Sequence, residues 1–369
     1  MKNTVLNIST LIYPFMLTNI TFGLVRVSDF LALVLFSVFI LLDNFKIKLN
    51  SLETFYLKLL FLMSVVSLLF TITTQSEHLN EFLRSSRVII YFYITVILIN
   101  HNKDMFIRWT LILILLHALL CVIGAFNQTV FSVLAEFTGY EKQWFLGRGN
   151  GLGASFDTAG FVIIAGIILL SLRYSKINLV LALFLLASGF FTGRTFMVLG
   201  PLIFFIFFIV RKTTCIKAAV SIPIFTLIAL VVVLLQIDFS MLVSFVKTLG
   251  TGDGYWGSTD KLINWAYQTE NYATWFGTGQ LADMDIGYSK AWYFGGIFYL
   301  LFQSLVVVML PILYFKKNIS IEIITILALI LVYNFKIYTF LAGIFMPLYI
   351  AIILLIYRVA SEEHVNEGS

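Results

Sequence analysis

The sequence predicts an all-α polytopic membrane protein, and three observations support this class. Of its 369 residues, 60% are hydrophobic and only 12% are charged, with a mean hydropathy of +0.98, whereas a soluble domain of ordinary composition is about 25% charged. Long apolar runs, interrupted by one or two charges, recur from end to end and are long enough to cross the hydrocarbon core of a bilayer. No regular alternation of apolar and polar residues is present, which argues against a β-barrel.

The apolar runs predict about twelve transmembrane helices in a single integral membrane domain covering residues 1–369. In chain order, these helices are expected at residues 6–25, 27–43, 55–74, 86–100, 106–125, 155–172, 177–192, 194–210, 216–236, 290–315, 319–335 and 338–357. The first run lacks a small-residue cleavage site before Arg26 and is therefore expected to be a retained helix rather than a signal peptide.

The lysines and arginines predict the orientation of the chain. With Lys2 on the cytoplasmic side, more than half of the 24 basic residues fall on that side, mostly in short loops. Both termini are then cytoplasmic. Two long connections, residues 127–154 and 237–289, fall on the periplasmic side. Both contain tryptophans, so we expect them to fold against the membrane domain, with a short amphipathic helix at about 259–276.

Two glycine-containing segments carry arginines at the ends of predicted helices. The first, RGNGLGASFDTAG, covers residues 148–160 and contains Arg148 and Asp157; the second, SGFFTGRTF, contains Arg194. A charge near the hydrocarbon boundary is costly unless it is paired or faces a wet cavity. Arginine presents a planar set of donors that suits phosphate oxygens. These residues are therefore candidates for a functional site, whereas Arg26 and Arg84 are expected to be interfacial anchors to lipid phosphate.

Several classes of site do not fit the sequence. The glycines around Arg148 match neither dinucleotide nor P-loop spacing, and no strand precedes them. The four histidines lie outside both long connections and form no metal-ligand pattern, so neither a metal nor another cofactor is expected. The net charge of +5 is accounted for largely by cytoplasmic loops, so no nucleic-acid partner is expected. Cys121 and Cys215 are expected at opposite membrane faces and unbridged.

The order of these motifs resembles that of the bacterial O-antigen polymerases (the Wzy family) and, more distantly, the O-antigen ligases. The resemblance covers most of the chain by topology. Its motifs are the glycine-rich segment at 147–160, SGFFTGRTF at 188–196, and FGTG followed by DIGYSKAWYFGG within 276–297. In two places the sequence departs from these families. Ala159 occupies the glycine position of the polymerases' Arg-x10-Gly pattern, and the histidine used by the ligases is missing from 237–289.

The resemblance implies a GT-C-like glycosyltransferase of the bacterial inner membrane. Such enzymes transfer a growing glycan from one undecaprenyl diphosphate carrier onto a new lipid-linked repeat unit at the periplasmic face. It also implies that outer-loop arginines bind the diphosphate, and suggests a chain-length regulator as a further partner besides membrane lipid. By motif position Arg148 and Arg194 take the diphosphate-binding role, with Arg87 as a lesser candidate.

The chemistry of glycosyl transfer suggests roles for further residues of the outer segments. A lipid diphosphate is already a good leaving group, so the protein chiefly needs to neutralise its charge and position the acceptor hydroxyl. Asp285 is the expected general base, with Glu270 and Asp260 as weaker candidates, although substrate assistance could replace a base. Tyr288, Lys290 and Asp157 are expected to position substrate. The alternatives are a ligase-like glycosyltransferase and a flippase of lipid-linked oligosaccharide.

Overall fold

The computed structural model describes most of the chain outside the segment 211–274. The described residues are 2–18, 20–22, 25–43, 49–73, 80–139, 144, 146–153, 155–172, 175–210, 275–277, 287–315, 321–334 and 345–367.

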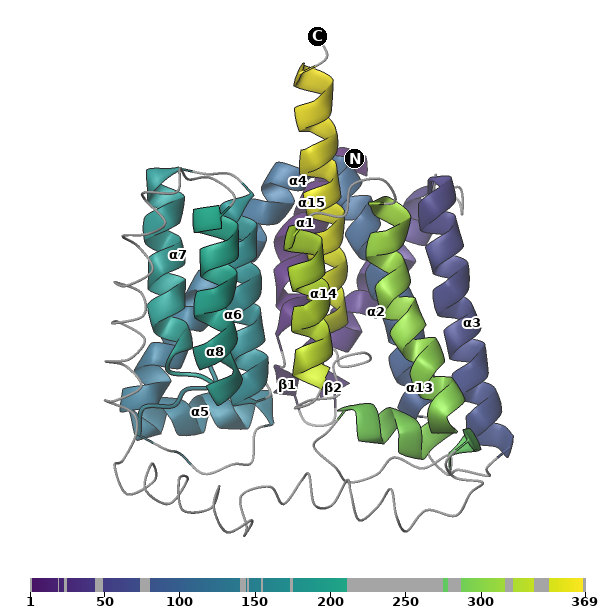
Figure 1. Ribbon diagram of the computed structural model, residues 1–369, viewed down its shortest axis with the longest axis horizontal. Coiled ribbons are helices and arrows are strands. Elements are labelled where there is room, and N and C mark those ends of the chain that lie inside the picture. Colours follow the sequence, from purple (N-terminus) through teal and green to yellow (C-terminus); the bar gives the residue numbers. More distant parts are fainter. Residues whose placement is uncertain are drawn as a thin grey trace.

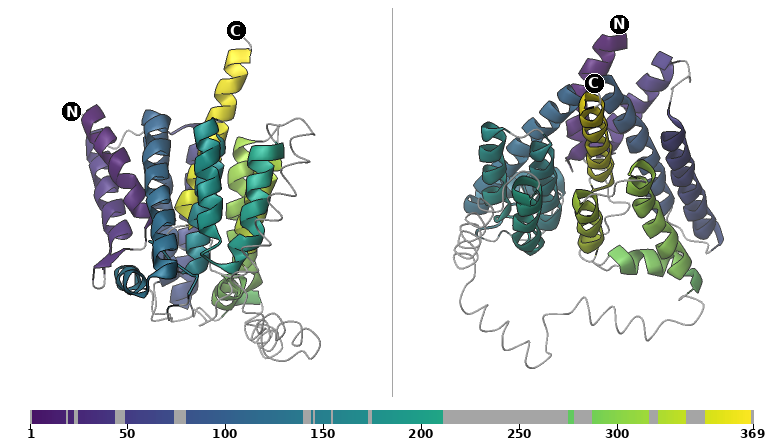
Figure 2. Two further views of the ribbon diagram at one scale, coloured as in Figure 1. Left: turned by 90° about the vertical axis from the view of Figure 1, so that its left-hand side faces the viewer. Right: turned by 45° about the horizontal axis from the view of Figure 1, so that its top comes forward.

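The described residues form a bundle of helices that stand side by side, and both chain termini lie at one end of the bundle (Figures 1 and 2). We call this end the termini end. The opposite end, at the bottom of Figure 1, carries a two-stranded hairpin and is called the hairpin end. The elements are α1 (Lys2–Ile12), η1 (Tyr13–Leu17), β1 (Thr21–Phe22), β2 (Val25–Arg26), α2 (Val27–Asp43), α3 (Ser51–Thr73), α4 (Asn80–Phe126), α5 (Gln128–Thr138), α6 (Phe156–Ser171), α7 (Lys176–Gly189), α8 (Arg194–Phe204), η2 (Phe205–Val210), α13 (Gly287–Tyr314), α14 (Ile321–Asn334) and α15 (Phe345–Glu367).

Three of these helices are long and apolar enough to cross a membrane: Ser51–Thr73, Glu81–Phe126 and Lys290–Tyr314. Six shorter apolar helices accompany them among the described residues. Large apolar side chains on the outside of the bundle, including Leu41, Phe61 and Ile72, are exposed, as expected for a surface in contact with lipid rather than water. Apart from the short β1–β2 hairpin, the described part of the chain is therefore helical, and it is compatible with a membrane protein.

The first predicted helix, at 6–25, is wrong in its second half. The helix passes into a 3-10 turn at Tyr13–Leu17, where Pro14 lacks a backbone N–H, and Thr18 is extended. The chain then forms the β1–β2 hairpin, in which Thr21 pairs with Arg26. Arg26 thus lies immediately before α2, as predicted, but it is on a hairpin and not at the end of a continuous helix.

Two of the long helices bend. The predicted helices at 86–100 and 106–125 form the single element α4, which is broken at Asn102, whose φ and ψ are −157° and 91°. Helix α13 begins at Gly287 and bends at Gly295 and Gly296. Its first limb lies across the hairpin end and its second limb runs along the bundle (Figure 1). The predicted helix at 216–236 lies outside the described residues, and the described part of the last helix begins at Phe345 rather than 338.

The first long connection contains a helix that sequence analysis did not predict. Helix α5 lies across the hairpin end (Figure 1). The Asn127 side chain accepts a hydrogen bond from the N–H of Val130 at its start, and Gly139 closes it in the left-handed conformation with φ 63°. Nearly all of the second connection, including most of the predicted amphipathic helix at 259–276, lies outside the described residues.

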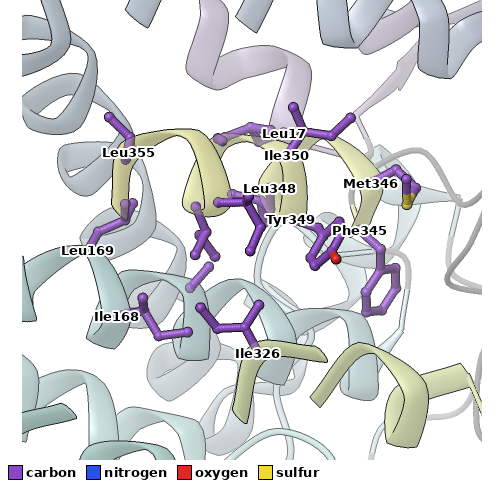
Figure 3. Packing of buried hydrophobic residues seen from close by; sticks show 14 of the residues in the cluster. Leu17, Ile168, Leu169, Ile326, Phe345, Met346, Leu348, Tyr349, Ile350 and Leu355 are labelled. Carbon is purple, nitrogen blue, oxygen red and sulfur yellow. The ribbon is translucent and has the colours of Figure 1, made fainter. Parts of the chain in front are cut away.

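Helices α6 and α15 lie at the centre of the bundle. Every residue of α6 except Asp157 is buried, and the turns of α15 from Phe345 to Ile356 are buried on all sides. Figure 3 shows α15 packed against α6, α14 and Leu17 of η1. A helix that is apolar around its whole circumference is stable when other helices or lipid surround it. The position of α6 fixes where its polar first turn emerges at the hairpin end.

Candidate functional site

The glycine-rich segment before α6 and the hinge between α7 and α8 meet through their backbones. The Gly149 N–H donates to the Phe191 carbonyl across 2.7 Å, and the Gly193 N–H donates to the Phe156 carbonyl across 3.2 Å. A Cβ on Gly149 would overlap the Cys121 carbonyl of α4, so only glycine allows the segment to lie this close to that helix. The two arginine-bearing motifs, far apart in sequence, therefore form one unit at the hairpin end.

The first turn of α6 is joined to the first turn of α8. The Ser155 side chain caps α6 by accepting from the N–H of Thr158, and Asp157 follows in the first turn. The Thr195 hydroxyl donates to Asp157 Oδ1 across 2.8 Å. A Cβ on Gly193 would overlap that same carboxylate oxygen. Asp157 thus lies between two helix N-termini, whose partial positive charges stabilise a carboxylate.

Arg148 packs on the ring of Phe156. Its guanidinium carbon lies 5.7 Å from the ring centroid, and Arg148 is half-buried. Phe156 itself packs with Phe131 of α5 and with Trp144, whose indole N–H donates to the Gly124 carbonyl. A contact of this kind is attractive and restricts the guanidinium to one region of the surface. The Arg148 guanidinium therefore lies beside the start of α6 rather than extending away from it.

The side chain of His117 in α4 binds the backbone of the glycine-rich segment. The Leu152 N–H donates to His117 Nδ1 across 2.9 Å, which places the ring proton on Nε2, and Nε2 lies 3.3 Å from the Ala159 carbonyl. The ring is 2% exposed. Sequence reasoning missed this residue because a lone histidine in an apolar helix carries no signal of the distant segment that it contacts.

A buried tyrosine of α14 lies close to the first turns of α6. A Cβ on Gly160 would be 3.3 Å from the Tyr333 hydroxyl oxygen and 3.0 Å from the Thr192 hydroxyl oxygen, so both hydroxyls lie close to Gly160. The Tyr333 ring packs on Phe161 and Phe345. Within the described part of the chain, this hydroxyl makes no hydrogen bond although it is fully buried. Such a group is available to a ligand or a water molecule.

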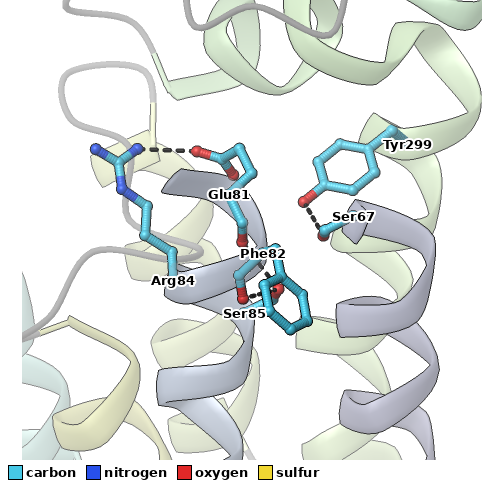
Figure 4. A network of polar contacts seen from close by, with 6 residues as sticks. All are labelled: Ser67, Glu81, Phe82, Arg84, Ser85 and Tyr299. Carbon is cyan, nitrogen blue, oxygen red and sulfur yellow. Dashed lines mark hydrogen bonds and ion pairs between the residues drawn. The ribbon is translucent and has the colours of Figure 1, made fainter. Parts of the chain in front are cut away.

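Arg87, the third predicted phosphate ligand, is in a different cluster. Its Nη2 atom pairs with Asp29 Oδ2 of α2 at 2.8 Å. One turn earlier in α4, Arg84 Nη1 pairs with the fully buried Glu81 at 2.9 Å (Figure 4). Arg87 is therefore not part of the unit formed by the two glycine motifs.

The motif FGTG meets the bend in α13. A Cβ on Gly277 would overlap the Phe294 carbonyl, and a Cβ on Gly296 would overlap the Trp275 carbonyl. Both glycines have positive φ, 69° and 68°. The two glycines allow the backbones to cross and hold the first limb of α13 at the hairpin end. Just beyond the bend, Tyr299 and Ser67 of α3 share a hydrogen bond of 2.9 Å (Figure 4).

The remaining predicted site residues divide into two groups. Asp285, Glu270 and Asp260 lie outside the described residues, and so do the side chains of Arg194 and Tyr288, whose backbones begin α8 and α13. Lys290 is half-buried in the first limb of α13. The structure thus brings together the segments of Arg148, Asp157 and Arg194, and it leaves the predicted acids of the second connection untested.

The chemistry available in the described part of the site is that of anion recognition. A restrained guanidinium and the N-termini of two helices lie at one end of the bundle. No group of three or more metal-binding side chains is found among the described residues. No protein-family model, curated protein or solved structure matches the chain.

Proposed function

We propose that this protein is a membrane glycosyltransferase that polymerises oligosaccharide repeat units carried on undecaprenyl diphosphate. The reaction would take place at the periplasmic face of the bacterial inner membrane, which we assign to the hairpin end of the bundle. The observation that carries the proposal is the backbone junction between the Arg148 segment and the Arg194 hinge. A reaction whose leaving group is a lipid diphosphate needs cations fixed at the membrane boundary.

Arg148 is proposed to bind the diphosphate of the donor lipid. Its contact with Phe156 holds the guanidinium beside the start of α6, so little conformational entropy is lost on binding. Arg194 is proposed to contribute a second cation, since its backbone begins α8 at the same junction. Charge that develops on the leaving diphosphate is then stabilised by guanidiniums and helix N-termini together.

Asp157 is proposed to position the site rather than to act as a base. One carboxylate oxygen accepts from Thr195, and the residue lies in the first turn of α6 beside the Arg148 segment. Asp285 is retained as the proposed general base because it immediately precedes the first limb of α13, which lies at the hairpin end (Figure 1). Tyr288 and Lys290 follow it and are proposed to contact the sugar or the phosphate.

Complementation of a bacterial strain that lacks its own repeat-unit polymerase tests this proposal. The strain must make the repeat unit that this protein uses, and the glycan ladder is read on a gel at matched protein levels. We expect wild type to restore a ladder, and Arg148→Ala, Arg194→Ala and Asp285→Ala to leave single-repeat product. Arg108→Ala is the matched control, because Arg108 is an exposed arginine just beyond the bend of α4. Normal ladders from both arginine variants would contradict the proposed phosphate site.

A further inference from the structure

Three arginines near the hairpin form a second basic cluster at the same end of the bundle. Arg84 and Arg87 lie in the first two turns of α4, and Arg26 ends strand β2. Arg87 and Arg84 bind Asp29 and Glu81, respectively. Arg26 keeps part of its surface exposed. Its partial burial lowers the pKa of its guanidinium, and the charges of Arg87 and Arg84 lower this pKa further, whereas Asp29 raises it. Arg84 and Arg87 are three residues apart on one face of α4, and Arg26 lies three residues before Asp29, which binds Arg87, so the three arginines lie close together. A bound anion would relieve the repulsion among them.

The surroundings of this cluster indicate a lipid rather than a soluble anion. Phe30, next to Asp29, is 58% exposed, and Leu83, next to Arg84, is 55% exposed. These side chains belong to helices whose outer surfaces are apolar, so an acyl or isoprenoid chain could lie along them while its head group contacts the arginines.

The cluster is connected to the Arg148 segment through one turn of α5. The Thr21 hydroxyl of the hairpin donates to the Phe137 carbonyl across 3.2 Å. The next residue of α5, Thr138, accepts from the Asn150 side-chain amide across 3.2 Å, and Asn150 belongs to the glycine-rich segment. The two basic regions are thus separate but are linked through these hydrogen bonds at the same end of the bundle.

We propose that Arg26, Arg84 and Arg87 form a second binding site for the phosphate of a lipid head group. In the polymerisation reaction, two lipid-linked substrates must be held at once. The second site then holds the diphosphate of the acceptor lipid while the donor diphosphate lies at Arg148. This assignment of the acceptor rests on the proposed function, whereas phosphate binding by the cluster does not.

Native mass spectrometry of the purified protein tests both parts by counting bound lipids. The probes are undecaprenyl diphosphate and phosphatidylglycerol, each titrated separately. We expect wild type to bind two molecules of undecaprenyl diphosphate, and Arg26→Gln and Arg148→Ala to retain one each, with at least a tenfold weakening of the other. Arg108→Gln, at the far side of the bend in α4, is expected to retain both.

A second variant protects the test against misfolding, because Arg84 neutralises a buried acid. The double substitution Arg84→Gln with Glu81→Gln removes both charges of that pair and is expected to weaken the same lipid as Arg26→Gln. Unchanged stoichiometry and affinity in both variants would overturn the second site. If the cluster bound phosphatidylglycerol as tightly as undecaprenyl diphosphate, this result would support a phosphate site and overturn its assignment to the acceptor. Two bound diphosphates without any polymer would support the site while contradicting the proposed function.

Discussion

Thr195 donates a hydrogen bond to the Asp157 carboxylate across 2.8 Å, and this contact joins the first turns of α8 and α6. It lies beside the two backbone hydrogen bonds that join the glycine-rich segment to the hinge. The geometry at the start of α6 therefore depends on a few polar contacts between segments that are separated by roughly forty residues.

Replacing Thr195 by valine should loosen this junction without changing the volume of the side chain. The half-buried carboxylate would lose a hydrogen bond, which we expect to lower the free energy of unfolding by about 1–2 kcal/mol. Thr195→Ser keeps the hydroxyl and should recover most of that loss. Thermal unfolding of both variants in detergent measures the difference, and equal midpoints for valine and serine would show that the hydrogen bond contributes nothing.

Replacing His117 by phenylalanine should release the glycine-rich segment from α4. The Leu152 N–H and the Ala159 carbonyl would both lose their side-chain partner in a buried region. An unsatisfied buried polar group costs about 1–3 kcal/mol, so we expect the variant to be less stable by about 2 kcal/mol or more. Hydrogen exchange at residues 147–153 should accelerate.

His101→Phe is the matched control, because His101 is a partly exposed histidine of α4 that contacts Asn7 instead. Exchange in the glycine-rich segment should be unchanged in that control. If His117→Phe and His101→Phe gave the same exchange rates, the anchoring role of His117 would be wrong.

Gly149 and Gly124 offer a paired test of close backbone packing. A Cβ on Gly149 would overlap the Cys121 carbonyl, whereas a Cβ on Gly124 would be no closer than 3.7 Å to any neighbour. We expect Gly149→Ala to destabilise the protein by about 3 kcal/mol or to prevent its accumulation in the membrane. Gly124→Ala should be neutral or slightly stabilising, since alanine favours a helix. Fluorescence-detected size exclusion reports both, and a well-folded Gly149→Ala variant would refute the contact.

Gly296 and Gly147 separate steric overlap from backbone strain. Both have positive φ, 68° and 81°, but only the Cβ on Gly296 would meet another segment, at the Trp275 carbonyl. Nothing lies within 4 Å of the position of a Cβ on Gly147. Gly147→Ala should therefore cost only the strain of a left-handed residue, about 1–2 kcal/mol, and Gly296→Ala should cost more. Thermal midpoints in the reverse order would contradict the crossing of these segments.

The membrane class of the fold and several helix bounds follow from hydropathy, because lipid imposes long apolar runs. Helices α2, α6 and α7 begin and end within about three residues of their predicted bounds. The hairpin after Pro14 and the amphipathic helix α5 were not predicted. Both are short elements at the hairpin end of the bundle, and turn and capping residues rather than hydropathy determine them.

The candidate site was predicted only in its outline. The glycines next to Arg148 and Arg194 suggested a close approach of the backbone to a ligand, but nothing in the sequence showed that these two segments pack on each other. His117 and Tyr333 were missed because their neighbours come from distant helices. Arg87 was a candidate for the diphosphate site, but α4 begins earlier, at Asn80, and the pairing of Arg87 with Asp29 depends on the arrangement of α2 and α4.

Polymerisation by the purified protein is the most direct test of the proposed function. The protein is mixed with an undecaprenyl-diphosphate-linked repeat unit, and the lipid-linked products and free undecaprenyl diphosphate are separated by mass. The proposed function predicts one free diphosphate lipid for each added repeat, with both products reduced at least a hundredfold in Arg148→Ala and unchanged in Arg108→Ala. Lengthened glycan formed equally well by Arg148→Ala, or no lengthened glycan from folded wild type supplied with its own repeat unit, would contradict it.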